Sequence, residues 1–116
     1  LIDSGCGLIL LSGGMSVDPD DVTRTAVREA GAGEILYGAA VLPGAMFLAA
    51  YIDGVPVLGV PACGLHHRIT VLDLVLSRVL AGGRVEKKDL AFLGHGGLCR
   101  DCDRCLYPHC PFGKGV

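Results

Sequence analysis

The feature that most constrains the fold is an apolar run that stops abruptly at a loop of small residues. Residues 8–11 read LILL, and Ser12, Gly13 and Gly14 follow directly. A short apolar run bounded by glycines is typical of a buried parallel strand. The run therefore favours an α/β domain, with a loop of nearly bare backbone at the end of one strand.

The composition fits the same class of protein. Hydrophobic residues make up 51% of the chain and aromatic residues 5%, which is typical of an α/β core built from Val, Leu, Ala and Gly. The 116 residues are enough for one domain with one core. We expect an α/β domain over residues 1–93 and a separate tail over residues 94–116, where Gly, Cys, His and Pro replace the apolar pattern.

The charge pattern excludes two classes of partner. The formal net charge is −2, so we expect no general attraction to nucleic acid or to membranes. The longest uncharged stretch, residues 35–52, is interrupted by Gly38, Pro43 and Gly44, which predicts strands and turns and no membrane span. With no visible secretory signal, we expect a cytoplasmic protein whose cysteines are reduced.

Turn and capping residues divide the rest of residues 1–93 into further elements. Asp18-Pro19-Asp20 is typical of a helix start, and Asp53-Gly54 is typical of a tight hairpin turn. The resulting prediction is a helix from this start to Gly31, strands over 34–40, 46–52 and 55–60, and helices over 65–80 and 86–93.

The small-residue loop is a candidate anion site. Exposed backbone N–H groups beside a helix start bind phosphate, and the hydroxyls of Ser12 and Ser16 would add donors. The alternative is a tight turn in which Asp18 only caps the next helix. The acids Asp18, Asp20 and Asp21 would tolerate a phosphate if they held Mg²⁺. The alternative is that they complement the helix dipole.

The sequence SGGMSVDPDDVT resembles the signature loop of the molybdopterin-binding domain shared by molybdenum cofactor biosynthesis proteins such as gephyrin. The resemblance continues through VLPGAMFLA, VPVLGVPACG and LDLVLSRVLAGG, and covers about residues 8–83. It implies a three-layer α/β sandwich with a mostly parallel sheet, and molybdopterin as the ligand.

The resemblance also implies which residues contact the ligand. Ser12, Gly13 and Gly14 match the loop that contacts the pterin phosphate, and Asp21 matches the functional aspartate of the family. Pro43 and Gly44 match the second turn of the family motif. Gly59 and Pro61 match the third turn.

Two departures from the family pattern weaken the expectation of catalysis. Ala45 stands where the biosynthetic enzymes usually carry a lysine after Pro-Gly, and residues 61–64 read PACG in place of Pro-Gly-Asn-Pro. Losing a lysine beside bound phosphate removes a favourable charge. Residues 66–68 (His-His-Arg) would supply replacement donors, or would be solvated residues at a helix start.

The family fold normally begins with further strand–helix units, which this sequence does not include. We therefore expect the chain to be completed by a companion N-terminal segment or by a second copy of itself.

The tail carries a cysteine pattern that predicts a metal site. The spacing is C-x2-C-x2-C-x4-C, followed by proline, at Cys99, Cys102, Cys105 and Cys110. Four thiolates so close together in a reducing compartment favour a metal over disulfides. The run is closer to the bacterial ferredoxin run than to the paired cysteines of zinc sites, so an iron–sulfur cluster is favoured narrowly over zinc.

Other residues would modify this metal site. His95 or His109 is able to replace one thiolate, and the nearby cations Arg100, Arg104 and Lys114 would offset the thiolate charge. The remaining cysteines, Cys6 and Cys63, are expected to be small buried residues.

Three functions remain open from the sequence. The first is molybdopterin binding in cofactor assembly or delivery, with a metal-binding tail. The second is a non-catalytic sensor or carrier that binds the pterin and uses the tail for redox response or docking; the absence of a lysine at Ala45 favours it. The third is a structural module with no ligand.

Overall fold

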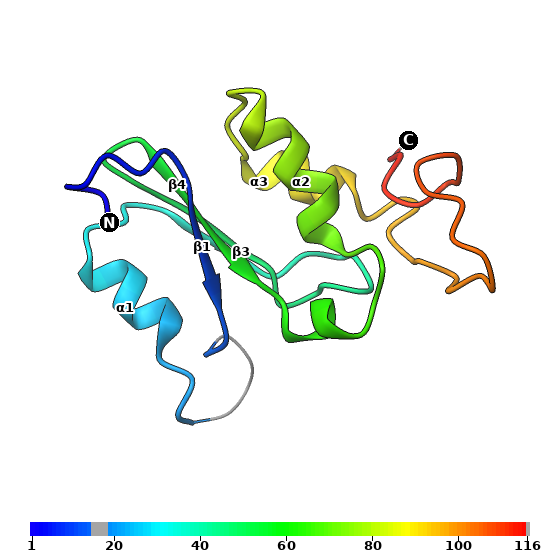
Figure 1. Cartoon of the computed structure of the whole chain (residues 1–116), viewed down its shortest axis with the longest axis horizontal. Helices are drawn as coiled ribbons and strands as arrows, with labels where there is room; N and C mark the ends of the chain where they lie inside the picture. Colours follow the sequence, from blue (N-terminus) through cyan, green and yellow to red (C-terminus); the bar gives the residue numbers. More distant parts are fainter. Residues whose placement is uncertain (15–18, 116) are drawn as a thin grey trace. The chain divides into compact units, whose positions relative to one another are not determined.

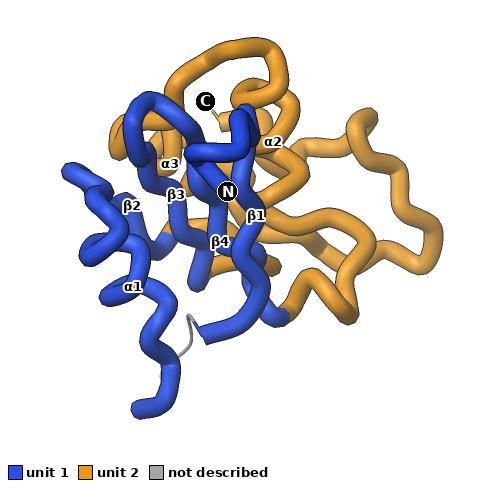
Figure 2. The backbone as a smooth tube through the Cα atoms, turned by 60° about the vertical axis from the view of Figure 1, so that its left-hand side comes forward, with its two compact units in different colours: residues 1–38, 46–62 blue, residues 39–45, 63–116 orange. Residues whose placement is uncertain are grey.

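The computed structural model describes residues 1–14 and 19–115 and divides into two compact units (Figure 2). Unit 1 comprises residues 1–38 and 46–62, and unit 2 comprises residues 39–45 and 63–116. The sheet belongs to unit 1. The helices over residues 71–80 and 87–92 and the cysteine-rich tail belong to unit 2.

Unit 1 contains a four-stranded sheet with the strand order β1-β4-β3-β2 (Figure 1). The strands are β1 (Ile9–Ser12), β2 (Ile35–Tyr37), β3 (Leu48–Ile52) and β4 (Val55–Val60). Among the described strands, β1 is parallel to β4, whereas β4–β3 and β3–β2 are antiparallel. The α/β class is thus confirmed, but the sheet is mixed, and neither a mostly parallel sheet nor a three-layer arrangement is confirmed.

The hairpin turn explains why the sheet is mixed. β3 and β4 are joined by Asp53 and Gly54, with φ of 50° and 79°, and Ile52 pairs with Val55 across the turn. Two positive φ values in a two-residue turn are what a type I′ hairpin requires, and such a turn joins only antiparallel strands. The predicted hairpin is confirmed, and it excludes a fully parallel arrangement.

One face of the sheet is packed against α1 (Thr23–Glu29), which lies beside the strands in Figure 1. The apolar cluster joins Val27 of the helix and Ala32 after it to Leu48, Ala50 and Val57 of the sheet. Within the described residues the helix starts later than the predicted position near Asp18. The helix begins at Thr23 and its first turn has no acidic residue, so Pro19 and Asp20 lie in the turn before it.

Unit 2 contains α2 (Val71–Leu80) and α3 (Lys87–Phe92), and a short 3-10 helix, η1 (Ala62–Leu65), leads into it. The single helix predicted over 65–80 is therefore shorter, because Thr70 fixes a later start. The Thr70 hydroxyl accepts a hydrogen bond from Leu72 N–H (3.2 Å), and Thr70 N–H donates to Asp73 Oδ2 (2.7 Å). These two reciprocal bonds form a capping box.

One face of α2 is buried, and an ion pair joins α2 to α3. Val71, Val75 and Val79 are buried on α2, and Arg78 Nη1 lies 3.0 Å from Asp89 Oδ1 of α3. No helix in the described part of the chain is long and apolar enough to cross a membrane.

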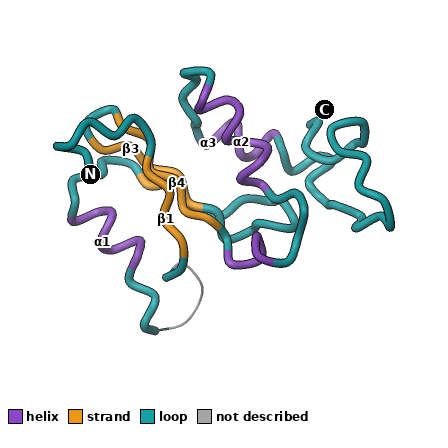
Figure 3. The backbone as a smooth tube through the Cα atoms, viewed as in Figure 1, coloured by secondary structure: helices purple, strands orange, loops and turns teal. Residues whose placement is uncertain are grey.

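The tail follows α3 as irregular chain (Figure 3) and is nevertheless packed. Leu98 forms a parallel β-bridge with Leu42, supported by bonds from Leu42 N–H to Gly97 O and from Cys99 N–H to Leu42 O, both 2.7 Å. Phe112 is 5% exposed. Phe112 therefore provides an apolar anchor in a segment where the sequence no longer shows the apolar pattern of the preceding residues.

Replacing Thr70 with alanine tests the start of α2. Removing the hydroxyl leaves Leu72 N–H without its partner, so we expect the free energy of unfolding to fall by about 1 kcal/mol. Urea denaturation measures the change. Ser77→Ala, at an exposed position of the same helix, is the control and should change stability by less than about 0.5 kcal/mol. Equal effects of both substitutions would contradict the capping role.

Candidate functional site

The parallel pairing of β1 and β4 brings two of the predicted motifs to one edge of the sheet. Ser12 lies opposite Val60 in the register, so the loop after Ser12 and the turn at Pro61 leave adjacent strand ends. The carboxyl ends of parallel strands are where α/β sheets bind ligands. We call residues 12–14 the glycine loop.

The glycine loop is closed by the first residue of α1. Gly13 and Gly14 have φ of 84° and 68°, a backbone conformation that glycine adopts without strain. Thr23 Oγ1 donates to Gly13 O (2.9 Å), and Thr23 N–H donates to Gly14 O (3.1 Å). A Cβ at Gly14 would overlap Thr23 Oγ1, so this position requires glycine.

This arrangement occupies the loop carbonyls and leaves the amides available. Among the hydrogen bonds that join described residues, neither Gly13 N–H nor Gly14 N–H is a donor. Ser12 and Gly13 are exposed, and Gly14 is half-buried. Backbone N–H groups that face outward from a turn of this kind form a concave site for an anion.

Thr23 was not identified as a site residue from the sequence. Its signal was present, because a hydroxyl residue at the start of the helix after a glycine-rich loop is able to bond the loop carbonyls. The signal was overlooked because the helix was expected to start earlier, near Asp18.

Asp21 lies near the residue that closes the glycine loop, Thr23. It is half-buried and precedes Thr23 by two residues, so its Cα lies within about 7 Å of the Thr23 Cα. Ser16 and Asp18 lie outside the described residues. Within the described residues no three His, Cys, Asp or Glu side chains are grouped so that they could hold a metal ion, and the predicted Mg²⁺ therefore gains no support.

Gly59 does not lie in a turn, which corrects the position implied by the resemblance. It is buried inside β4, opposite Leu11 of β1 and Leu48 of β3. The strand continues to Val60 and ends there because Pro61 has no N–H to continue the ladder. Pro61 is buried and begins the turn at the edge of the sheet.

The second motif turn, Pro43-Gly44, belongs to unit 2 and supports the start of α2. Val71 N–H donates to Pro43 O (3.2 Å), and a Cβ at Gly44 would lie 2.5 Å from Val71 Cγ1. The next two amides, of Leu72 and Asp73, are bonded to Thr70. This helix start therefore has its first amides occupied, and Ala45 beside the turn adds no charge.

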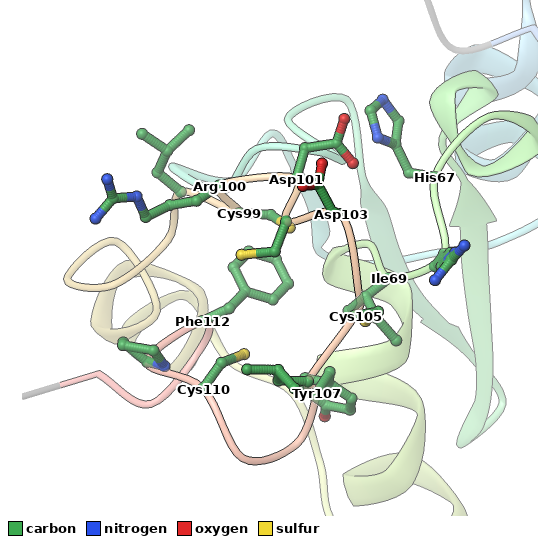
Figure 4. Close-up of a pocket in the computed structure, with 15 residues that line it drawn as sticks. His67, Ile69, Cys99, Arg100, Asp101, Asp103, Cys105, Tyr107, Cys110 and Phe112 are labelled. Carbon is green, nitrogen blue, oxygen red and sulfur yellow. The ribbon is translucent and has the colours of Figure 1, made fainter.

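The four tail cysteines line a single hollow in unit 2 with a volume of about 360 Å³, which we call the tail hollow. Figure 4 shows Cys99, Cys105 and Cys110 at separate places around it. All four thiols are free. They are not gathered into the metal group that the sequence predicted, since the described residues contain no such group of three.

The structure also places the remaining histidines, arginine and cysteines that the sequence singled out. His67 and Arg68, considered as donors for the altered third turn, line the tail hollow. His66 is exposed, and its N–H donates to Cys63 O (3.0 Å). Cys6 and Cys63 are half-exposed, so the expectation that both are buried is wrong.

Comparison with known proteins identifies the family. A family model described as a probable molybdopterin-binding domain matches residues 2–89. The chain belongs to this family, which links it to molybdopterin and to molybdenum cofactor biosynthesis. Searches of curated proteins and of solved structures each give no significant match. The whole tail, residues 94–116, lies beyond the matched residues.

Replacing Thr23 with valine tests how the glycine loop is held. Valine keeps the shape of the side chain but loses the hydrogen bond to Gly13 O, so we expect the loop to open more easily, by about 1 kcal/mol. Hydrogen exchange of the residue-23 amide, whose N–H donates to Gly14 O, measures this opening. Thr25→Val, at an exposed position of the same helix, should leave the exchange of this amide unchanged. If both variants exchange alike, Thr23 does not hold the loop.

Proposed function

We propose that the chain binds molybdopterin in cofactor biosynthesis or delivery, with the terminal phosphate of the pterin on the glycine loop. The observation that carries the proposal is the conformation of Gly13 and Gly14, whose carbonyls bond to Thr23 while their N–H groups are not used among the described residues. A phosphate accepts hydrogen bonds from such amides. The family match supports a pterin as the molecule that carries it.

The donors at this loop suit a phosphorylated ligand. Ser12 is exposed and supplies a hydroxyl, and the glycines allow the phosphate to approach the backbone closely. Asp21 would orient the ligand, or would share Mg²⁺ with the phosphate if the cation arrives with it. Gly59 and Pro61 would shape the neighbouring strand end, and Pro43 and Gly44 would act by holding α2.

The alternative function is a non-catalytic carrier or sensor. The feature that favours it is Ala45, which provides no positive charge where the family's enzymes usually have lysine. Adenylation and molybdate insertion both handle concentrated negative charge, which a nearby lysine stabilises. A carrier needs only to bind the pterin. We expect it to work in the cytoplasm, where the tail cysteines stay reduced.

Anaerobic calorimetry with molybdopterin tests the binding proposal. We expect the wild type to bind and Gly14→Ala to bind at least about tenfold more weakly, which corresponds to about 1.4 kcal/mol, because the new Cβ displaces the loop from Thr23. Gly33→Ala is the matched control, since a Cβ there meets nothing. Asp21→Asn should weaken binding only when Mg²⁺ is present, if the carboxylate holds the cation.

The same samples distinguish the two functions. ATP-dependent adenylation of the bound pterin would support a biosynthetic enzyme, and binding without adenylation would support the carrier. Absence of pterin binding by the wild type would refute both.

We also propose that β1 pairs with a strand from a second copy of the chain. β1 is at one end of the described sheet, so one side of its backbone is open to another strand. Leu10 on β1 is apolar and 49% exposed. Sedimentation should show a dimer that Leu10→Lys converts to monomer, whereas Arg28→Lys on α1 should leave the dimer intact. A wild-type monomer would contradict this pairing and would favour a companion segment in its place.

A further inference from the structure

The cysteines of the tail lie on a loop whose two ends are fixed by the backbone. At the first end, Cys99 N–H donates to Leu42 O (2.7 Å); at the second end, Gly113 N–H donates to Gly96 O (2.9 Å). Phe112, beside the second end, is 5% exposed. Residues 99–110 therefore form a closed loop whose base is held by backbone hydrogen bonds.

The loop encloses a hollow rather than a packed core. Its volume is about 360 Å³, and all four tail cysteines line it. Cys99 and Cys110 are half-buried near the base, and Cys102 and Cys105 are exposed. In Figure 4 the ring of Phe112 lies among the labelled cysteines. Four reduced thiols around one space are the donor set of a metal centre.

The arrangement of the thiols does not fit a single metal ion. Zinc requires all four ligand atoms about 2.0–2.3 Å from one point, and within the described residues no three candidate ligands are arranged to hold one ion. An iron–sulfur cluster contains several metal atoms, and each thiolate binds a different one, so the cluster does not require the four thiols to meet at one point.

The spacing of the cysteines leads to the same class of ligand. C-x2-C-x2-C-x4-C followed by Pro111 differs by one residue from the ferredoxin run C-x2-C-x2-C-x3-C-P. Zinc sites more often use two separated pairs. The chain has no second set of cysteines at this spacing, so all four ligands would serve one cluster.

The remaining lining residues are compatible with a negatively charged cluster. Arg68 and Arg100 line the hollow, together with the apolar side chains of Ile69 and Phe112. Cations offset thiolate charge, and an apolar wall limits the access of water to the cluster. Asp101 and Asp103 also line it and, like Arg68 and Arg100, are exposed, so water and salt screen the charges of both signs alike.

We propose that the tail binds one iron–sulfur cluster through the thiolates of Cys99, Cys102, Cys105 and Cys110. The proposal does not depend on pterin binding, because these cysteines lie beyond the residues that match the family model and belong to unit 2. It assigns a ligand to the tail and makes no claim about electron transfer.

Anaerobic reconstitution with ferrous iron and sulfide tests the proposal. The wild type should retain iron and acid-labile sulfide in equal amounts, about four of each per chain, with visible thiolate-to-iron absorbance. Cys102→Ser and Cys105→Ser should each lower the retained iron about tenfold or more. Because both residues are exposed, circular dichroism of these variants without metal should match that of the wild type.

Controls within the same chain make the outcome decisive. Cys6→Ser and Cys63→Ser remove thiols outside the tail hollow and should retain wild-type amounts of iron and sulfide. The proposal is overturned if the wild type takes up one zinc ion and no sulfide in a mixture of both metals, if it binds no metal, or if the Cys6 and Cys63 variants lose as much iron as the tail variants.

Discussion

The position of β4 between two partners is the constraint on which unit 1 depends. On one side its residues pair in parallel with β1, and on the other side they pair antiparallel with β3. The first pairing places Ser12 at the same sheet edge as the turn that begins at Pro61. The second follows from the two-residue hairpin and makes the sheet mixed. Both the site and the topology thus result from the register of one six-residue strand.

The elements that could be predicted from the sequence are those with local determinants. The Asp53-Gly54 turn has a backbone requirement that few residue pairs meet, so the hairpin was correctly expected. The helix before Gly31 was also expected, but its start was misplaced, because the acids near residue 20 suggested a cap whereas Thr23 is the residue bonded to the loop. The Thr23 hydroxyl was the available signal, and it was overlooked because the helix was expected to begin earlier.

The candidate site shows the same division between local and distant information. The glycine loop was predicted from its residues, as an anion site or a tight turn, and from its resemblance to the family's signature loop. The bond from Thr23 to Gly13 O was not predicted, because it joins residues ten positions apart. Likewise, the cysteine spacing indicated a metal, but the burial of Phe112 and the bridge at Leu98, which hold the tail, were not expected from the sequence.

The held base of the cysteine loop has an implication for how this part of the protein can change. Its anchoring bonds join main-chain atoms of Leu42, Gly96, Cys99 and Gly113, so they place little direct demand on the side chains of residues 100–111, which precede the buried Phe112. Substitutions in that segment can accumulate while the helices of unit 2 stay intact. The tail is in this sense an exchangeable insert, and the cluster site proposed for it could change while the glycine loop stays the same.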